Sequence, residues 1–244
     1  MSGVLKLFDL SVERGGGTLL SELSCSVNAG EVVVVLGPNG AGKSSLLLAL
    51  AGLIPAEGSI EVLGRTLSDC DRNELTRSVA WQGELPPTEF GLTVAQRLEL
   101  AAGESGTDIK AAADSMDMAG LLHRPLGELS SGERQRTELA ALMLRDTPLW
   151  LLDEPTAHLD LKHQINTICM IREQRAAGRT IVTVLHDMQQ AMAVADALIL
   201  IDGNGGAEYG EAKELFDTGR LSRLFDAPVN MQGSVLVPDY GGKL

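Results

Sequence analysis

The sequence predicts an α/β fold with a mostly parallel core sheet, and two observations support this prediction. Runs in which every residue is apolar recur along the chain, for example at residues 32–36 (VVVVL) and 149–152 (LWLL). Runs of this kind are typical of strands that are buried on both faces of a parallel sheet. Helix-forming segments separate the runs, and this alternation indicates parallel strands joined by right-handed crossovers.

The expected elements follow in order along the chain. Two β-rich runs open it, at residues 5–12 and 19–27, and a buried strand (31–36) and a helix (43–50) come next. Later buried strands are expected at residues 149–152, 180–185 and 197–201. Between residues 86 and 145 the pattern changes to helix-forming segments (94–102, 109–119 and 133–144) without a clear strand.

We therefore predict a single domain over residues 1–244. Its core lobe comprises residues 1–85 and 146–202, and a helical subdomain (86–145) is inserted between these two parts. Residues 203–244 form a C-terminal tail, whose shorter patterns predict small helices and an edge strand near residues 235–237. Because 44% of the 244 residues are hydrophobic, the chain can bury a core of this size.

Composition and charge exclude several classes of protein. The net charge of -13 repels phosphate backbones, so nucleic acid is not expected as a partner. The three cysteines, Cys25, Cys70 and Cys169, match no metal-ligand spacing and are expected to be free thiols in a reducing cytosol. No apolar run approaches the ~18–20 residues of a spanning helix, so another chain would have to supply any membrane part.

A complete phosphate-binding loop lies between the buried strand at 31–36 and the helix at 43–50. Residues 37–44 read GPNGAGKS, which fits the pattern G-x-x-x-x-G-K-S in the strand–helix context that gives this motif its meaning. The glycines let backbone N–H groups bind phosphate oxygens, and the helix N-terminus adds partial positive charge. Lys43 is expected to reach the β- and γ-phosphates, and the hydroxyl of Ser44 to bind Mg²⁺.

Two carboxylates end the buried strand at 149–152. Asp153 can hold Mg²⁺ through water, and Glu154 can polarise an attacking water molecule. A plain acidic strand end would look the same in isolation. Its occurrence together with the phosphate loop favours the catalytic interpretation.

Three further features are ambiguous on their chemistry alone. Residues 129–135 read LSSGERQ, in which Ser130 and Glu133 form a capping box that would start any helix, although a helix start with Gly132 can also bind an anion. His186 follows a buried strand, where a lone histidine is more often structural than catalytic. Gln82, in residues 79–82 (VAWQ), is equally unremarkable by itself.

Taken together, the order of these motifs resembles the ATP-binding subunits of ABC (ATP-binding cassette) proteins. The phosphate loop, Gln82, LSSGERQ, residues 151–156 (LLDEPT), residues 158–160 (HLD) and His186 are similar to the Walker A, Q-loop, signature, Walker B, D-loop and H-loop of that family. The resemblance covers residues 5–201. It implies a P-loop NTPase fold in which an N-terminal antiparallel β subdomain and an inserted helical subdomain flank the core sheet.

The resemblance also implies roles for the matching residues. Glu154 would be the catalytic base, His186 would contact the γ-phosphate, and Gln82 would sense Mg²⁺. Ser130 and Gly132 would contact ATP held by a second copy of the chain, so that a head-to-tail homodimer closes over two ATP molecules. The expected catalytic residues are Glu154, His186 and Lys43; the expected cofactor-binding residues are Gly37, Pro38, Asn39, Gly40, Ala41, Gly42, Lys43, Ser44, Ser45, Gln82, Ser130, Gly132 and Asp160; the expected metal ligands are Ser44, Gln82 and Asp153.

The chain departs from the family pattern at two places. Ser131 stands where the family usually has the first glycine of its signature, and its side chain could crowd the closed dimer. The family usually stacks an aromatic ring on adenine, whereas residues 13–17 read ERGGG and offer only Arg14 as a planar group. These departures bear on ATP turnover and on selectivity for adenine, and not on ATP binding.

Finer features are similar to the ATPases of importers for cobalamin, haem and ferric siderophores, such as residues 160–164 (DLKHQ) and 185–188 (LHDM). This implies a motor that docks on permease subunits through a groove near Gln82 and residues 90–97. It would lie in the cytoplasm, peripheral to the inner face of the cell membrane, and would serve a solute-binding protein indirectly. A soluble ABC ATPase without a permease, as in cofactor assembly, and a nucleotide-binding regulator that does not hydrolyse ATP are the alternatives.

Overall fold

The computed structural model describes residues 3–83, 85, 91–103, 108–233 and 235–239. A six-stranded core sheet crosses it in the order β10-β9-β3-β8-β7-β6. These strands are β10 (Ala207–Glu211), β9 (Ala197–Ile201), β3 (Val32–Leu36), β8 (Thr180–Val184), β7 (Leu149–Asp153) and β6 (Val79–Gln82). All neighbours in this sheet are parallel except β9 and β10. The predicted α/β fold with a mostly parallel core sheet is therefore confirmed.

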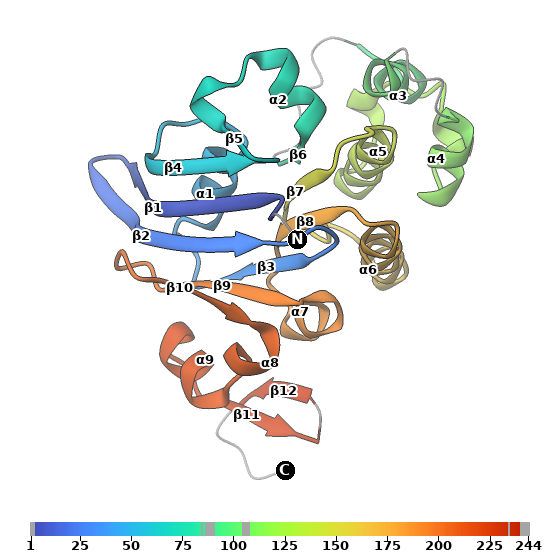
Figure 1. Cartoon of the computed structure of the whole chain (residues 1–244). Coiled ribbons are helices and arrows are strands. Elements are labelled where there is room, and N and C mark those ends of the chain that lie inside the picture. Colours follow the sequence, from blue (N-terminus) through green and yellow to red (C-terminus); the bar gives the residue numbers. More distant parts are fainter. Residues whose placement is uncertain (1–2, 84, 86–90, 104–107, 234, 240–244) are drawn as a thin grey trace.

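A second, antiparallel sheet lies over the core sheet in the order β2-β1-β4-β5 (Figure 1). Its strands are β1 (Leu5–Arg14), β2 (Gly17–Val27), β4 (Glu57–Val62) and β5 (Arg65–Thr66). Sequence reasoning expected the first two strands but missed β4, β5 and the short helix α2 (Arg72–Ser78) that follows them.

Alternation along β3 explains why its sequence is apolar at every position. Val33 and Val35 face a core shared with the antiparallel sheet and with helix α1 (Lys43–Leu50). Val32, Val34 and Leu36 face a second core, to which α6 (Leu161–Ala176) and α7 (Met188–Val194) contribute. Because successive side chains of a strand point to opposite faces, a strand between two cores must be apolar throughout.

Helices α3 (Val94–Ala102), α4 (Ile109–Ser115) and α5 (Ser131–Met143) gather at one end of the core sheet (Figure 1). They fall within the predicted helical subdomain, although the boundaries at residues 85, 145 and 202 stay predictions. The expected helix at 109–119 ends at Ser115, and Asp117 adopts a positive φ of 53°. Residues 119–121 form a separate 3₁₀ turn.

The tail carries α8 (Ala212–Leu215), α9 (Thr218–Phe225), β11 (Val229–Gln232) and β12 (Val235–Pro238). The expected edge strand at 235–237 is β12, which pairs with β11 in a sheet of its own and not with the core sheet.

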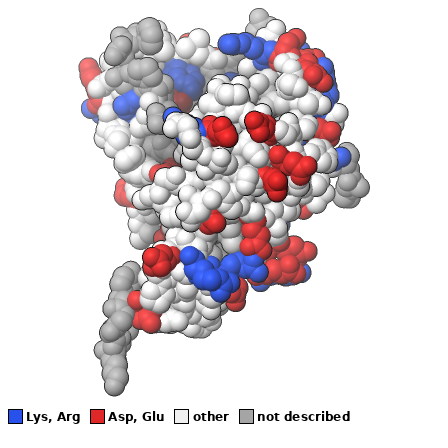
Figure 2. All heavy atoms as spheres, turned by 90° about the vertical axis from the view of Figure 1, so that its left-hand side faces the viewer, with Lys and Arg blue, Asp and Glu red and all other residues white. Residues whose placement is uncertain are grey.

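Figure 2 shows a face on which acidic and basic side chains lie beside one another. In the tail, Arg220 pairs with Glu208 and Lys213 with Glu211.

Candidate functional site

The carboxyl ends of four neighbouring parallel strands carry the chemically interesting residues. Strand β3 leads into the phosphate loop, β7 ends at Asp153, β6 ends at Gln82, and His186 comes two residues after the end of β8. In an open parallel sheet this edge is where ligands bind. The topology thus brings together residues that lie up to about 150 positions apart in the sequence.

Close packing explains why the loop between β3 and α1 needs glycine. A Cβ atom added to Gly37 would lie 2.1 Å from the carbonyl oxygen of Ile201, which no side chain could tolerate. Gly42 has a φ of 101°, and a Cβ atom there would lie 2.8 Å from the Cβ atom of Leu19. The two glycines allow the loop to run against β9 on one side and β2 on the other, so its backbone can turn toward a ligand.

Lys43, the first residue of α1, is 6% exposed and points back into the loop. Its Nζ atom donates to the carbonyl oxygens of Gly37 and Pro38 at 2.9 Å each. Burial lowers the pKa of Lys43, and the nearby carboxylates of Glu154 and Asp153 act in the opposite direction. A phosphate group can replace one of these carbonyl acceptors and gain a charge-assisted hydrogen bond.

The carboxylates at the end of β7 have different surroundings. Burial raises the pKa of Asp153, while a hydrogen bond from the Ser44 hydroxyl lowers it. Glu154 adopts a positive φ of 51°, its backbone N–H donates to the carbonyl of Val184 at 3.2 Å, and its Oε1 atom lies 2.6 Å from Nε2 of His186. The strained backbone turns Glu154 toward the solvent side of the loop, where it and His186 are about half exposed.

Two buried oxygen atoms at this edge have no hydrogen-bond partner among the described residues. They are Oε1 of Gln82, a residue that is 5% exposed, and Oδ1 of Asp153. A buried acceptor without a hydrogen-bond partner costs free energy, so such atoms usually bind an ion or a water molecule. Carboxylate, amide and hydroxyl oxygens are ligands that Mg²⁺ accepts, and Ser44 supplies the hydroxyl. The donor set therefore fits a magnesium ion.

Two hollows open beside these residues. One, of about 360 Å³, is lined by Asn39, Gly40, Lys43 and Ser44 of the loop, and by Arg14 from the tip of β1. The other, of about 610 Å³, is lined by Ser44, Asp153, Glu154 and again Arg14. Glu154 borders both. A ligand that lies along the loop would therefore meet the cations Lys43 and Arg14 as well as the carboxylate of Glu154.

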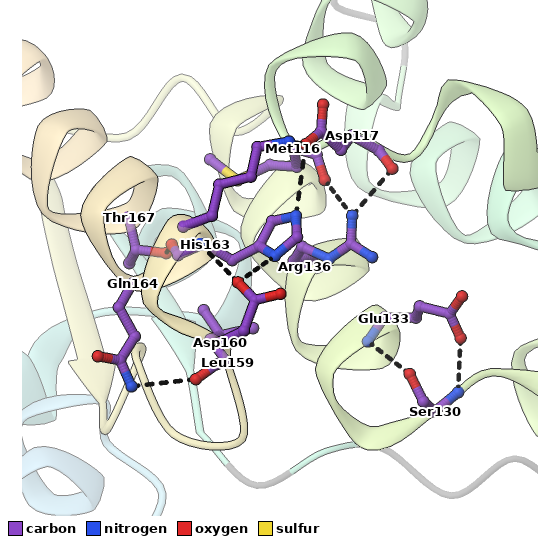
Figure 3. A network of polar contacts seen from close by, with 11 residues as sticks. Met116, Asp117, Ser130, Glu133, Arg136, Leu159, Asp160, His163, Gln164 and Thr167 are labelled. Carbon is purple, nitrogen blue, oxygen red and sulfur yellow. Dashed lines mark hydrogen bonds and ion pairs between the residues drawn. The ribbon is translucent and has the colours of Figure 1, made fainter.

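Ser130, Gly132 and Asp160 do not line either hollow of their own chain. Ser130 caps α5 in a capping box with Glu133, as its sequence predicted (Figure 3). Asp160 caps α6: it accepts from the His163 N–H at 2.9 Å, and Nδ1 of His163 lies 2.7 Å from the same oxygen.

Figure 3 also shows how the start of α6 is tied to the helical subdomain. The carboxylate of Asp117 binds Lys162 at 2.5 Å and lies 3.4 Å from Nε2 of His163. Arg136 of α5 donates to the backbone carbonyls of Met116 and Asp117 at 2.8 and 2.9 Å. The imidazole of His163 thus stands between two carboxylates, one from each part of the molecule.

Sequence reasoning assigned no role to Gln135, although it lies within the LSSGERQ segment. Its side chain is 3% exposed, and Nε2 donates to the backbone carbonyl of Pro155 at 3.1 Å and, more weakly, to that of Glu154 at 3.4 Å. Fully buried glutamines are uncommon, and the burial of Gln135 shows only in the structure, because its sequence carries no mark of it. Gln135 holds the backbone that carries Glu154 against α5.

The chain is similar in sequence to proteins of one known family. Residues 20–157 match the family model described as ABC transporter. The chain is 40% identical, over 91% of its length and 83% of the relative's, to a hemin import ATP-binding protein HmuV of Streptomyces coelicolor. A protein of the same name from Thermobifida fusca is 34% identical, over 93% of this chain and 84% of its own.

The chain belongs to the ABC transporter family. It is an ABC ATPase, the ATP-binding subunit of a transporter, as the resemblance of its motifs predicted. Among solved structures, an ATP-binding subunit of an ABC transporter superposes with a TM-score of 0.79 at 24% identity and covers 91% of this chain and 94% of that one. A nucleotide-free ATP-binding cassette gives a TM-score of 0.77 at 20% identity, with 90% and 98% covered. These two neighbours support the fold.

Within the described part of the chain, no helix combines the length and the apolar character that a membrane crossing demands.

Proposed function

We propose that this ABC ATPase powers the import of haem through a membrane permease. The observation that carries the proposal is the 40% identity to a hemin import ATP-binding protein across 91% of the chain. Several further relatives at 30–35% identity bear the same name. Cobalamin and ferric siderophores are the other solutes that the sequence suggested, and haem is the one that the relatives favour.

The roles proposed for the site residues are supported by their geometry and by the family resemblance. Lys43 and the loop N–H groups, with the neighbouring Ser45, bind the phosphates. The buried oxygens of Gln82 and Asp153, together with the hydroxyl of Ser44, would hold Mg²⁺. The ion, when bound, neutralises charge on the β- and γ-phosphates.

Glu154 accepts a proton from the attacking water. His186, whose Nε2 atom lies 2.6 Å from Oε1 of Glu154, contacts the γ-phosphate and orients this carboxylate.

Ser130, Gly132 and Asp160 complete the site of a second copy. This part of the proposal rests on their position outside the hollows of their own chain and on the family resemblance. The working form is then a homodimer attached to two permease subunits on the inner face of the membrane, and a solute-binding protein acts from the other side. Of the docking groove predicted near Gln82 and residues 90–97, residue 90 lies outside the described residues.

Reconstitution tests the proposal. The chain is co-expressed with the permease encoded beside it and placed in vesicles, and haem uptake is measured with ATP on the motor side. ATP-dependent haem uptake, abolished by Glu154→Gln in the same complex, is expected. Uptake of cobalamin or a ferric siderophore but not of haem would overturn the solute assignment. Failure to co-purify with any permease would favour a soluble ABC ATPase.

A further inference from the structure

The tip of the β1–β2 hairpin carries an arginine where a stacking ring would be expected. The hairpin turns through Gly15 and Gly16, whose φ angles are 62° and 81°, so the turn itself offers no side chain. Leu19 anchors the start of β2 against the phosphate loop, because its Cβ atom lies directly beside Gly42. Arg14, which pairs with Gly17 across the same hairpin, therefore lies beside the phosphate loop.

The guanidinium of Arg14 points at the phosphate end of the site. Its Nη1 atom donates to the hydroxyl of Ser45, in the first turn of α1, at 3.4 Å. Arg14 also lines both hollows: the one formed by the loop and the one that contains Asp153 and Glu154. A side chain that contacts only the nucleobase would not be expected beside Asp153 and Glu154, which lie where the γ-phosphate is expected.

The guanidinium of Arg14 has no ion-pair partner among the residues that the structure describes. Its long hydrogen bond to Ser45 engages one of its five N–H donors. A guanidinium presents these donors in a planar fork that matches phosphate oxygens. Lys43, the other cation of this hollow, offers only a point charge.

We propose that Arg14 binds the triphosphate of the nucleotide and not its base. The proposal rests on the binding of ATP at the phosphate loop. Affinity at this site then comes from the phosphates, and the base contributes little, because no ring faces it from the hairpin. The chain should bind ATP, GTP and CTP with similar affinity, and it should also bind inorganic tripolyphosphate.

The test compares ligands with and without a base. Dissociation constants of ATP, GTP, CTP and inorganic tripolyphosphate are measured with Mg²⁺ for the purified chain and for Arg14→Ala, Arg14→Lys and Arg14→Trp. Arg172→Ala, which removes an exposed arginine from α6, is the matched control. Loss of a charge-assisted hydrogen bond predicts that Arg14→Ala weakens all four ligands by a common factor of roughly ten to a hundred.

The other variants sharpen the outcome. Arg14→Lys should recover part of the affinity for every ligand, and Arg14→Trp should favour the three nucleotides over tripolyphosphate. If Arg14→Ala weakens ATP while tripolyphosphate binds within twofold of wild type, Arg14 acts on the base and the proposal is wrong. Unchanged affinity for all four ligands would also overturn it. Neither result would affect the assignment of the transported solute, which is tested in vesicles.

Discussion

A Cβ atom added to Gly132 would lie 2.8 Å from the carbonyl oxygen of His158. The start of α5 and the loop after Glu154 are therefore in backbone contact within one chain. Any side chain at position 132 must push these two segments apart, so a substitution there would disturb the chain itself as well as a neighbouring copy. Ser131, the exposed first residue of α5, is the position at which the dimer can be tested without this effect.

Replacement of Ser131 by glycine should leave ATPase activity equal to or higher than that of the wild type. The Ser131 side chain points outward from its own chain, so any crowding arises only when two copies close. Phosphate release at saturating ATP measures the effect. A clear fall in activity, with the thermal unfolding midpoint unchanged, would mean that the serine hydroxyl makes a useful contact in the closed dimer.

Mixing two inactive variants should restore ATPase activity if the site is shared between copies. Lys43→Ala removes the main cation of the phosphate loop, and Ser131→Asp places a negative charge where the partner's γ-phosphate is expected. An aspartate in the first turn of a helix is well tolerated, so the second variant should fold. In a mixed dimer both lesions fall in one site, and the other site is intact.

Phosphate release by the mixture, compared with each variant alone, reads out this effect. Ser131→Asn is the control of similar volume without the charge. Absence of recovery, together with absence of ATP-dependent dimer closure in mixed dimers isolated through two different tags, would contradict a shared site.

Replacement of Asp153 by asparagine should stabilise the nucleotide-free chain and abolish hydrolysis of ATP. Burial raises the pKa of this carboxyl above its ordinary value. A carboxyl group with a higher pKa in the folded chain favours folding in its protonated form, so its ionised form lowers the free energy of unfolding at neutral pH. The variant should have the higher unfolding midpoint at pH 7, and its advantage should shrink as the pH falls through the raised pKa of Asp153.

Thermal unfolding of the wild type, of Asp153→Asn and of Asp114→Asn, an exposed control on α4, measures this. An unfolding midpoint for Asp153→Asn at or below that of the wild type at pH 7 would show that the ionised carboxylate is well compensated in the folded chain.

Sequence reasoning located the parts of the molecule whose signals are local. The all-apolar strand β3 and the glycine loop after it could be predicted because each of their residues has one evident reason to be there. Strand β4 was missed since only Ile60 and Val62 of its residues are buried. The early end of α4 also has a distant cause: Arg136, Lys162 and His163 hold Asp117 in a non-helical conformation.

In the site, too, some residues could be predicted from local patterns, whereas others depend on contacts between distant segments. Lys43, Ser44, Asp153 and Glu154 could be predicted because strand ends of one parallel sheet meet at one edge. The position of Asp160 as a helix cap outside the hollows depends on how α6 is attached, and the position of Arg14 at the site depends on the hairpin folding back onto α1, where Arg14 contacts Ser45. Neither contact leaves a pattern in the sequence.

The most direct measurement of the central claim is the rate of phosphate release by Glu154→Gln under conditions in which the wild type turns over. Loss of a general base predicts a rate at least ~10²-fold lower, with the dissociation constant of ATP close to that of the wild type. Glu173→Gln, which removes an exposed carboxylate from α6, should behave as the wild type. Near wild-type phosphate release by Glu154→Gln would contradict the claim that this carboxylate, beside His186, catalyses the hydrolysis of ATP.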